Sequence, residues 1–290
     1  MSEQREEVVP SRVGVLGGGR MGGGIAHAFL LAGAYVTVVE RDIASAEAAR
    51  ARIEESIDAS IARGFEGDEA LLRQALTVAT DAGAFGACRL VVEAVPELID
   101  LKLESLAEIE RQLPGDAILA SNTSSIPLSQ LAEALDRPDR FIGLHFFNPV
   151  PASKLIEVVV HDETDPALPE QARGWVRALG KTPITVSDSP GFASSRLGVA
   201  LALEAIRMVE QGVASAQDID LAMELGYRHP AGPLRTTDIV GLDVRLGIAE
   251  QLERDLGPRF APPQLLRYMV AEGKLGRKSG QGFYDWNNGE

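Results

Sequence analysis

His145 and Glu157 are the two residues of this sequence whose types and spacing best fit a catalytic pair. His145 follows an apolar run, and Glu157 interrupts the aliphatic run Leu155–Val160. If the two runs pair as antiparallel strands about Pro151, residues equidistant from Pro151 face each other. His145 and Glu157 are equidistant from it, so we expect their side chains to be neighbours.

A histidine beside a buried carboxylate is suited to general-base catalysis. The carboxylate accepts a hydrogen bond from one ring nitrogen, which fixes the tautomer and makes the other nitrogen more basic. A buried glutamate also needs such a partner, because an unpaired charge is costly to bury. A histidine can instead be purely structural, and we interpret His27, His161 and His229 as structural or surface residues.

A glycine-rich loop, Gly17-x-Gly19-x-x-Gly22, follows an apolar run and opens a helical segment. In a dinucleotide-binding loop, Gly17 would make the turn, Gly19 would admit the pyrophosphate, and Gly22 would let helix and strand pack closely. The next apolar run ends in Glu40, whose carboxylate would accept hydrogen bonds from a ribose and repel a 2′-phosphate. The sequence therefore predicts NAD rather than NADP. The neighbouring Arg41 argues the other way, since an arginine at this place can pair with the 2′-phosphate of NADP.

Polar side chains also follow the apolar run that ends at Ser121. In open α/β sheets the carboxyl ends of the strands line the ligand crevice, so we expect a serine of this segment to face it. Alternatively, Ser124 or Ser125 caps a helix around Leu128–Leu135.

The candidate site residues must be positioned by secondary-structure elements, and the sequence predicts alternating strands and helices. Helical spacing occurs at Ile53, Ile57 and Ile61, with Gly64 as the stop, and again over 98–113. Short apolar runs predict buried strands at 13–16, 36–39, 76–79, 90–94, 117–121 and 141–144. The alternation predicts an α/β fold with a Rossmann-like, doubly wound, mainly parallel sheet.

The pattern becomes helical after Pro190-Gly191. We therefore predict an NAD-binding domain over 1–188, which carries His145, and a smaller all-helical domain over 189–290. The alanine-rich stretch 196–209 is apolar over more than one face, so it forms either a domain core or a subunit interface.

Composition narrows the class of protein further. The 290 residues include 28 Lys and Arg against 42 Asp and Glu, which gives a formal net charge of −14. This balance argues against nucleic acid as a partner, since phosphate binding needs a surplus of cations. The single cysteine, Cys88, excludes a disulfide framework and a multi-cysteine metal site, and we expect no metal. We see no targeting segment or membrane span and expect a cytoplasmic protein.

Several motifs together indicate a family. They are Gly17-x-Gly-x-Met-Gly22-x-Gly-Ile-Ala26, Val92-Glu-Ala-Val95, Ala120-Ser-Asn-Thr-Ser-Ser125, Gly143-Leu-His-Phe-Phe-Asn-Pro-Val-Pro151 with Lys154-Leu-Ile-Glu157, Pro190-Gly-Phe192, and Lys278-Ser-Gly-Gln-Gly-Phe-Tyr284. With these motifs the chain resembles the L-3-hydroxyacyl-CoA dehydrogenase family, in particular its short bacterial 3-hydroxybutyryl-CoA members. The resemblance covers nearly the whole chain.

The resemblance implies NAD-dependent oxidation of a short-chain (S)-3-hydroxyacyl-CoA, such as 3-hydroxybutyryl-CoA, within fatty acid β-oxidation. It implies that His145 removes the 3-hydroxyl proton, that Glu157 orients His145, and that Ser124 lies between substrate and nicotinamide. The matching NAD-contacting positions are Glu40, Glu97, Lys102, Asn148 and Lys278. The CoA-contacting positions are Ser56 and Arg63, and Arg63 replaces a family lysine. It also implies that the helical domain over 189–290 is a substrate-binding and dimerisation domain, through which a homodimer forms.

One position departs from the family pattern. The family has Phe-x-x-Asn-Arg where this chain has Phe192-Ala-Ser-Ser195-Arg196. That asparagine helps to hold the reacting part of the substrate, and we keep Ser195 in the catalytic set. Either a water completes the contact of the shorter side chain, or the site favours a different acyl group, or it is less efficient.

Two other functions remain open at this point. One is a related NAD-dependent dehydrogenase of a free 3-hydroxy acid, of the sugar acid or carnitine type. The other is a non-catalytic NAD-binding protein.

Overall fold

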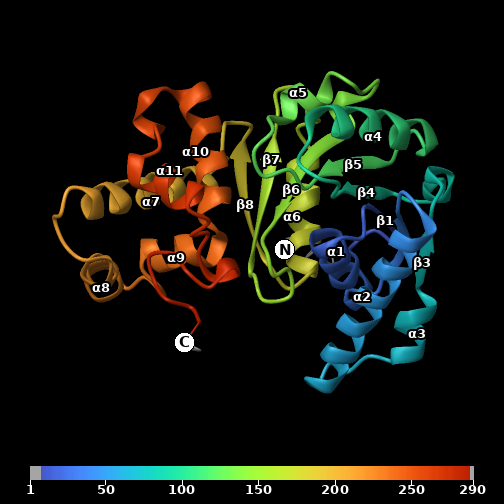
Figure 1. Cartoon of the computed structure of the whole chain (residues 1–290). Helices are drawn as coiled ribbons and strands as arrows, with labels where there is room; N and C mark the ends of the chain where they lie inside the picture. Colours follow the sequence, from blue (N-terminus) through green and yellow to red (C-terminus); the bar gives the residue numbers. More distant parts are fainter. Residues whose placement is uncertain (1–7, 288–290) are drawn as a thin grey trace, which may run out of the picture. The chain divides into compact units, whose positions relative to one another are not determined.

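The computed structural model describes residues 8–287 and divides into two compact units between Ser189 and Pro190 (Figure 1). The strands of the first unit are β1 (Arg12–Leu16), β2 (Tyr35–Val39), β3 (Leu76–Ala79), β4 (Leu90–Glu93), β5 (Ile118–Ser121), β6 (Phe141–Phe146), β7 (Leu155–Val160) and β8 (Thr182–Ser187). Its helices are α1 (Arg20–Leu31), α2 (Ile43–Ala62), α3 (Glu69–Gln74), α4 (Ile99–Gln112), α5 (Leu128–Ala132) and α6 (Leu168–Ala178).

The strands form one sheet in the order β3-β2-β1-β4-β5-β6-β7-β8. All neighbours are parallel except β6 and β7. The order reverses between β1 and β4, and right-handed crossovers then place helices on opposite faces. Figure 1 shows α1 and α2 on one face and α4 and α5 on the other. The expected Rossmann-like, doubly wound sheet is confirmed, and its reversal point is where such sheets bind ligands.

Burial explains most of the strands. β4, β5 and β6 are buried at every residue, and a strand covered on both faces appears in the sequence as an apolar run. All six predicted strands and the antiparallel run at 155–160 are confirmed. The strand β8 was not predicted, because it is an edge strand that is only partly buried and contains Pro183. Proline is tolerated at an edge, where a missing donor costs little.

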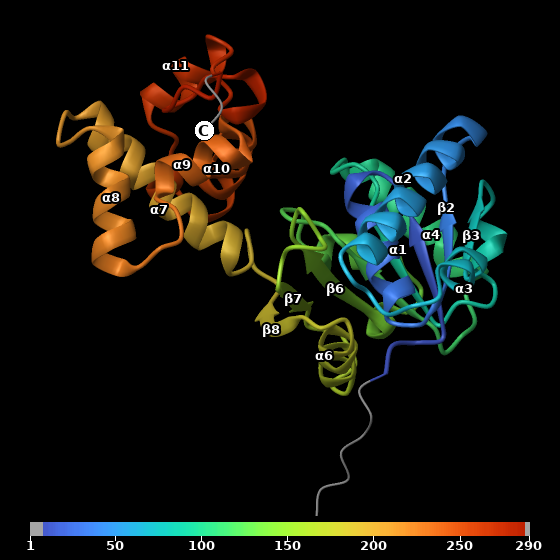
Figure 2. The ribbon, with the colours of Figure 1, turned by 90° about the horizontal axis from the view of Figure 1, so that it is seen from below.

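The second unit is helical (Figure 2). It has its own hydrophobic core. Its helices are α7 (Ser194–Glu210), α8 (Ala216–Tyr227), α9 (Pro233–Val240), α10 (Leu242–Leu256) and α11 (Gln264–Ala271). Buried Asp238 of α9 accepts hydrogen bonds from Phe283 N, Tyr284 N and Trp286 Nε1. This carboxylate fastens the C-terminal segment to the helices. Within residues 8–287, no helix is both long enough and apolar enough to span a membrane.

A buried ion pair joins α4 to the carboxyl edge of the sheet. Glu93 at the end of β4 accepts two hydrogen bonds from Lys102 Nζ, at 2.7 and 2.9 Å, and one from Ser121 Oγ of β5 at 2.6 Å. Glu93 and Lys102 are both fully buried. Lys102 Nζ also lies 3.2 Å from a carboxylate oxygen of Glu97, in the loop between β4 and α4. The pair therefore connects two strand ends to the loop above them.

Replacing Lys102 tests this connection. Lys102→Met should lower the free energy of unfolding by about 3–5 kcal/mol, because it leaves the Glu93 charge buried without its counter-ion. Chemical denaturation measures this loss. Lys154→Met, at an exposed lysine, is the matched control and should change stability little. The double variant Glu93→Gln/Lys102→Met should recover part of the loss, and equal stabilities of the two lysine variants would contradict the assignment.

Candidate active site

The antiparallel pairing of β6 with β7 places His145 opposite Glu157. His145 Nδ1 lies 2.7 Å from Glu157 Oε2, a hydrogen-bonding distance. The predicted register about Pro151 is therefore confirmed. Both side chains are buried, and the Phe147 ring packs against the imidazole with 4.5 Å between ring centroids.

This arrangement selects one form of the imidazole. A carboxylate can only accept, so Nδ1–H donates to Glu157 and the other ring nitrogen, Nε2, is left to bind or release a proton. The Glu157 charge also stabilises the imidazolium that forms when Nε2 takes a proton. The pair can therefore act as a general base and, in reverse, as a general acid.

The glycine-rich loop joins β1 to α1 at the same edge of the sheet. Gly17 has a φ of +86°, which favours glycine, and a Cβ at Gly22 would lie 1.7 Å from Gly17 O. A Cβ at Gly19 would meet no atom within 4 Å, so the loop is open there. Gly19 is the N-cap of α1, and no side chain caps this helix. The loop thus offers an open approach to the helix N-terminus, as a dinucleotide pyrophosphate requires.

Glu40 follows β2 and is tied to this loop. Its Oε1 accepts a hydrogen bond from Gly18 N at 2.6 Å. Arg41 points elsewhere, because its Nε pairs with Asp42 Oδ2 at 3.1 Å. The residue beside the loop is therefore a carboxylate, which suits a ribose diol and disfavours a 2′-phosphate.

Glu97 organises the serine-rich segment after β5. Its Oε1 accepts hydrogen bonds from Thr123 Oγ1 at 2.5 Å, Ser124 N at 2.8 Å and Ser125 N at 3.0 Å. Burial raises the pKa of Glu97, but the Lys102 charge and these hydrogen bonds outweigh it and hold the pKa below its usual value. Glu97 is therefore ionised at neutral pH.

Neither serine of this segment caps the following helix. Instead, Asp188 after β8 accepts hydrogen bonds from Leu128 N and Ser129 N at the start of α5. The capping alternative for Ser124 and Ser125 is therefore wrong. Both serines are half-buried.

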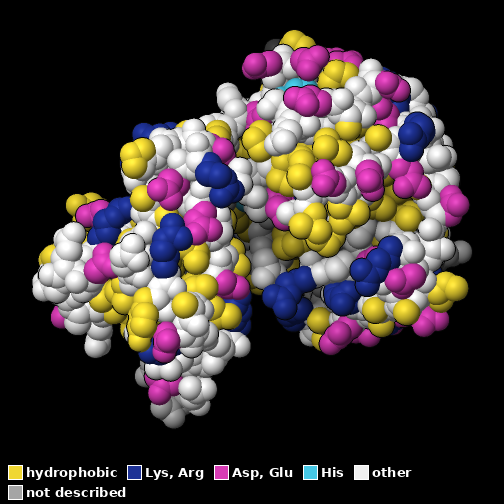
Figure 3. Space-filling model, turned by 45° about the horizontal axis from the view of Figure 1, so that its top comes forward, with side chains coloured by type: hydrophobic (Ala, Val, Ile, Leu, Met, Phe, Trp, Pro, Cys, Tyr) yellow, Lys and Arg dark blue, Asp and Glu magenta, His cyan; other side chains and the backbone are white. Residues whose placement is uncertain are grey.

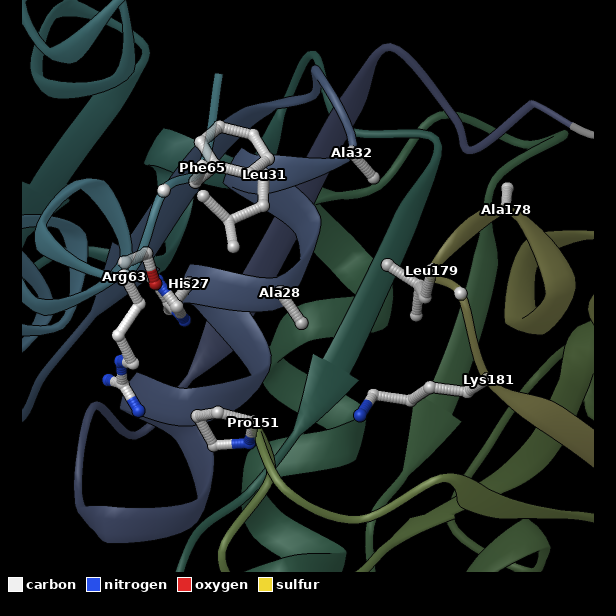
Figure 4. Close-up of a pocket in the computed structure, with 13 residues that line it drawn as sticks. His27, Ala28, Leu31, Ala32, Arg63, Phe65, Pro151, Ala178, Leu179 and Lys181 are labelled. Carbon is white, nitrogen blue, oxygen red and sulfur yellow. The ribbon is translucent and has the colours of Figure 1, made fainter. Parts of the chain in front are cut away.

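A pocket of about 520 Å³ lies between α1, the end of α2, Pro151 and the turn from α6 to β8. Arg63 and Lys181 approach Pro151 from opposite sides of the pocket (Figure 4). His27 also lines it, and no Asp or Glu is among the described residues that line it. The charge of the pocket is therefore positive. Ser56 lies earlier on α2, where its Oγ donates to Arg52 O at 2.9 Å.

The other predicted site residues are also located. Asn148 is exposed in the loop after β6. In the second unit, Ser195 lies half-buried in the first turn of α7. Lys278 Nζ donates to Asp243 Oδ2 of α10 at 2.6 Å.

The remaining histidines and the cysteine have no such arrangement. His27 Nε2 lies 3.0 Å from Ser60 Oγ, and burial together with Arg63 lowers the His27 pKa. His161 Nε2 lies 3.1 Å from Pro138 O. Burial raises the pKa of Cys88 to about 11, so this thiol is not a nucleophile at neutral pH. Among the described residues, no group of three or more His, Cys, Asp or Glu could hold a metal ion.

Sequence reasoning missed several residues that position the site. Asn122 Oδ1 accepts a hydrogen bond from Phe146 N at 2.8 Å and so joins the ends of β5 and β6. Lys181 Nζ donates to Val150 O at 2.6 Å and to Ser153 O at 2.5 Å, in the loop between His145 and Glu157. A polar residue at a strand end was a usable signal for Asn122. No local signal identifies Lys181, since its partners are about 30 residues away.

Comparisons with known proteins agree with this geometry. Two family models match the chain: "3-hydroxyacyl-CoA dehydrogenase, NAD binding domain" over residues 12–189 and "3-hydroxyacyl-CoA dehydrogenase, C-terminal domain" over residues 191–286. A 3-hydroxybutyryl-CoA dehydrogenase of Mycobacterium tuberculosis is 45% identical over 284 residues, which cover 95% of this chain and 98% of that protein.

Two further relatives extend this likeness. The human mitochondrial hydroxyacyl-coenzyme A dehydrogenase is 38% identical, over 98% of this chain and 94% of its own length. The crystal structure of (S)-3-hydroxybutyryl-CoA dehydrogenase from Ralstonia eutropha has a TM-score of 0.92 and 38% identity, over 96% of this chain and 100% of that chain.

The fold, the open glycine-rich loop with Glu40, and the two family matches agree along the chain. The cofactor is NAD. The chain belongs to the 3-hydroxyacyl-CoA dehydrogenase family of NAD-dependent oxidoreductases.

Proposed function

We propose that the protein oxidises short-chain (S)-3-hydroxyacyl-CoA, with 3-hydroxybutyryl-CoA as the first candidate, to the 3-oxoacyl-CoA with His145 as the general base. The observation that carries this proposal is the buried hydrogen bond of 2.7 Å between His145 Nδ1 and Glu157 Oε2. Relatives named 3-hydroxybutyryl-CoA dehydrogenase at 41–45% identity support the substrate.

NAD, when bound, supplies the acceptor for the hydride that leaves C3 of the substrate. His145 Nε2 takes the proton of the 3-hydroxyl, so that the C–O bond becomes a carbonyl without a build-up of positive charge at C3. Glu157 keeps the Nδ1–H tautomer and stabilises the imidazolium. In the reverse direction, the imidazolium returns its proton to the carbonyl oxygen.

The surrounding residues bind and orient. Ser124 contacts both substrate and nicotinamide, and Glu97 holds its backbone N–H. The glycine-rich loop receives the pyrophosphate at Gly19, where it is open, while Gly17 makes the turn and Gly22 lets α1 pack closely. Glu40 receives the adenosine ribose. Lys102 acts on the NAD site through Glu97, since its own side chain is buried. Asn148 and Lys278 complete the NAD contacts, and Ser195 holds the reacting part of the substrate.

The positive pocket beside α2 receives part of the CoA. Arg63 and Lys181 supply charge for its phosphates, while Leu31, Ala32 and Leu179 supply apolar contacts. Ser56 lies on α2, whose C-terminus is capped by Arg63, and extends this surface. The absence of acidic residues among the described lining residues supports an anionic ligand.

The other functions considered are less well supported. A dehydrogenase of a free 3-hydroxy acid would not need the positive pocket around Arg63, and the comparisons do not favour it. A non-catalytic NAD-binding protein would leave the buried His145–Glu157 pair without a use.

The protein acts as a homodimer joined through its helical unit. Large apolar side chains stand exposed there, among them Leu197, Val213, Leu225 and Tyr227. Burial of such side chains against a second copy is favourable by about 25 cal/mol for each Å² of apolar surface removed from water.

A comparison of two substrates tests the proposed reaction. NADH should be oxidised by acetoacetyl-CoA and not by free acetoacetate, because only the thioester carries the CoA phosphates that the Arg63 pocket binds. Absorbance of NADH at matched substrate concentrations measures both rates. Equal turnover of the two substrates would refute the assignment to CoA thioesters. NAD binding without turnover of any 3-oxo substrate would refute catalysis.

Variants of the central pair test the general base. His145→Gln should retain NAD binding and lower kcat by about 10²- to 10⁴-fold, because the proton acceptor is lost. Glu157→Gln should lower kcat less, since its amide oxygen still accepts from Nδ1–H. His229→Gln is the matched control and should match the wild type in steady-state kinetics. Near-normal kcat for His145→Gln would show that another group takes the proton.

The departure at Ser195 is tested by restoring the family residue. Ser195→Asn should change kcat/KM unequally across 3-oxoacyl-CoA chains of different length, because the longer amide reaches further toward the reacting atoms. A series of thioesters from four to ten carbons measures the profile. An unchanged rate on every chain length would remove position 195 from the substrate site.

A further inference from the structure

Arg245 is a buried cation without a partner. It lies in α10, and only 8% of the residue is exposed. Its Nε makes no hydrogen bond, and within residues 8–287 the guanidinium has no carboxylate partner. Lys102, also a buried cation, instead lies against the carboxylate of Glu93.

An unpaired buried guanidinium requires an explanation. Burying a charge is strongly unfavourable unless it is paired and hydrogen-bonded. Burial lowers the pKa of Arg245, and no nearby carboxylate opposes this shift. The folded chain therefore carries a largely buried guanidinium whose Nε has no partner among the described residues, and the natural complement of such a group is a carboxylate or phosphate oxygen.

The guanidinium lies against Gly198 of α7, close in sequence to Ser195. A Cβ added at Gly198 would lie 3.3 Å from Arg245 Nη1 and 3.9 Å from Nη2. Glycine at 198 thus leaves the space that the guanidinium fills. Ser195 is three residues earlier on α7, so it shares the face of Gly198 and lies a little less than one helical turn, ~4.5 Å, away along the axis.

We propose that Arg245 binds a carboxylate at the far end of the acyl chain, so that the enzyme accepts 3-hydroxyacyl-CoA substrates with a dicarboxylic acyl group. This inference rests on the proposed function, in which Ser195 holds the reacting part of the substrate. A few methylene groups span one helical turn, which matches an acyl chain of about six carbons. A planar carboxylate fits the fork of an arginine with two parallel hydrogen bonds.

The test compares two six-carbon 3-oxoacyl-CoA thioesters, one ending in a methyl group and one ending in a carboxylate. The full-length protein with NADH is assayed for kcat/KM on both, and the readout is the ratio of the carboxylate substrate to the methyl substrate. The wild type should favour the carboxylate substrate. A ratio of one or below would overturn the inference while leaving the proposed function intact. No turnover of either thioester would instead overturn the proposed function and the inference with it.

Variants identify the residue responsible for the ratio. Arg245→Met should lower the ratio by about 10- to 100-fold, since it removes a charged hydrogen-bonding partner. Arg245→Lys should lower it less, because the charge remains but the fork is lost. Gly198→Ala should also lower it, because the new Cβ crowds Nη1. Arg254→Met, at an exposed arginine of the same helix, is the matched control and should leave the ratio unchanged.

A thermal readout separates folding from recognition. Arg245→Met should raise the Tm of the ligand-free protein, since it removes an unpaired buried charge. If this variant does not fold, Gly198→Ala decides the question through the same ratio. If Arg245→Met and Gly198→Ala each lowered kcat/KM equally for both thioesters, the role of Arg245 would be purely structural and the inference would be overturned.

Discussion

The antiparallel pairing of β6 with β7 is the constraint on which the site depends. Side chains alternate between the two faces of a sheet, so a slip of one residue would move Glu157 to the opposite face from His145. The intervening loop must therefore have a defined conformation. Lys181 holds two of its carbonyl oxygens, and Val150 packs where Gly24 of α1 has no side chain. The loop between the catalytic strands is fixed by a helix and by the start of β8.

The conformation of the carboxyl edge of the parallel strands depends on buried charged side chains. Glu93 and Lys102 are buried together, and Lys102 orders Glu97, which in turn holds the segment of Ser124. The net charge of −14 does not describe these local fields. On the face shown in Figure 3, Lys and Arg side chains stand in small separate groups rather than in one continuous patch. Anionic NAD and CoA thus require local donors such as the glycine-loop amides and Arg63.

Most of the fold was predictable because its physical signals are local. A buried parallel strand appears as an apolar run, and a helix ends at a glycine such as Gly64, whose φ is +93°. β8 gave no such signal, since an edge strand tolerates Pro183 and is only partly buried. The cap of α5 was not predictable either. The capping residue, Asp188, is 60 residues from Leu128 in sequence.

The sequence by itself determined the alternation of strands and helices, the glycine-rich loop before Glu40, and the pairing of His145 with Glu157. These depend on spacing within one turn, one strand or one hairpin, where geometry follows directly from residue number. Only the tertiary structure decided that Lys181 holds the catalytic loop and that Arg245 lies buried beside Gly198 without a counter-ion. Such contacts join segments distant in sequence, and their energy depends on burial that exists only once each unit has folded.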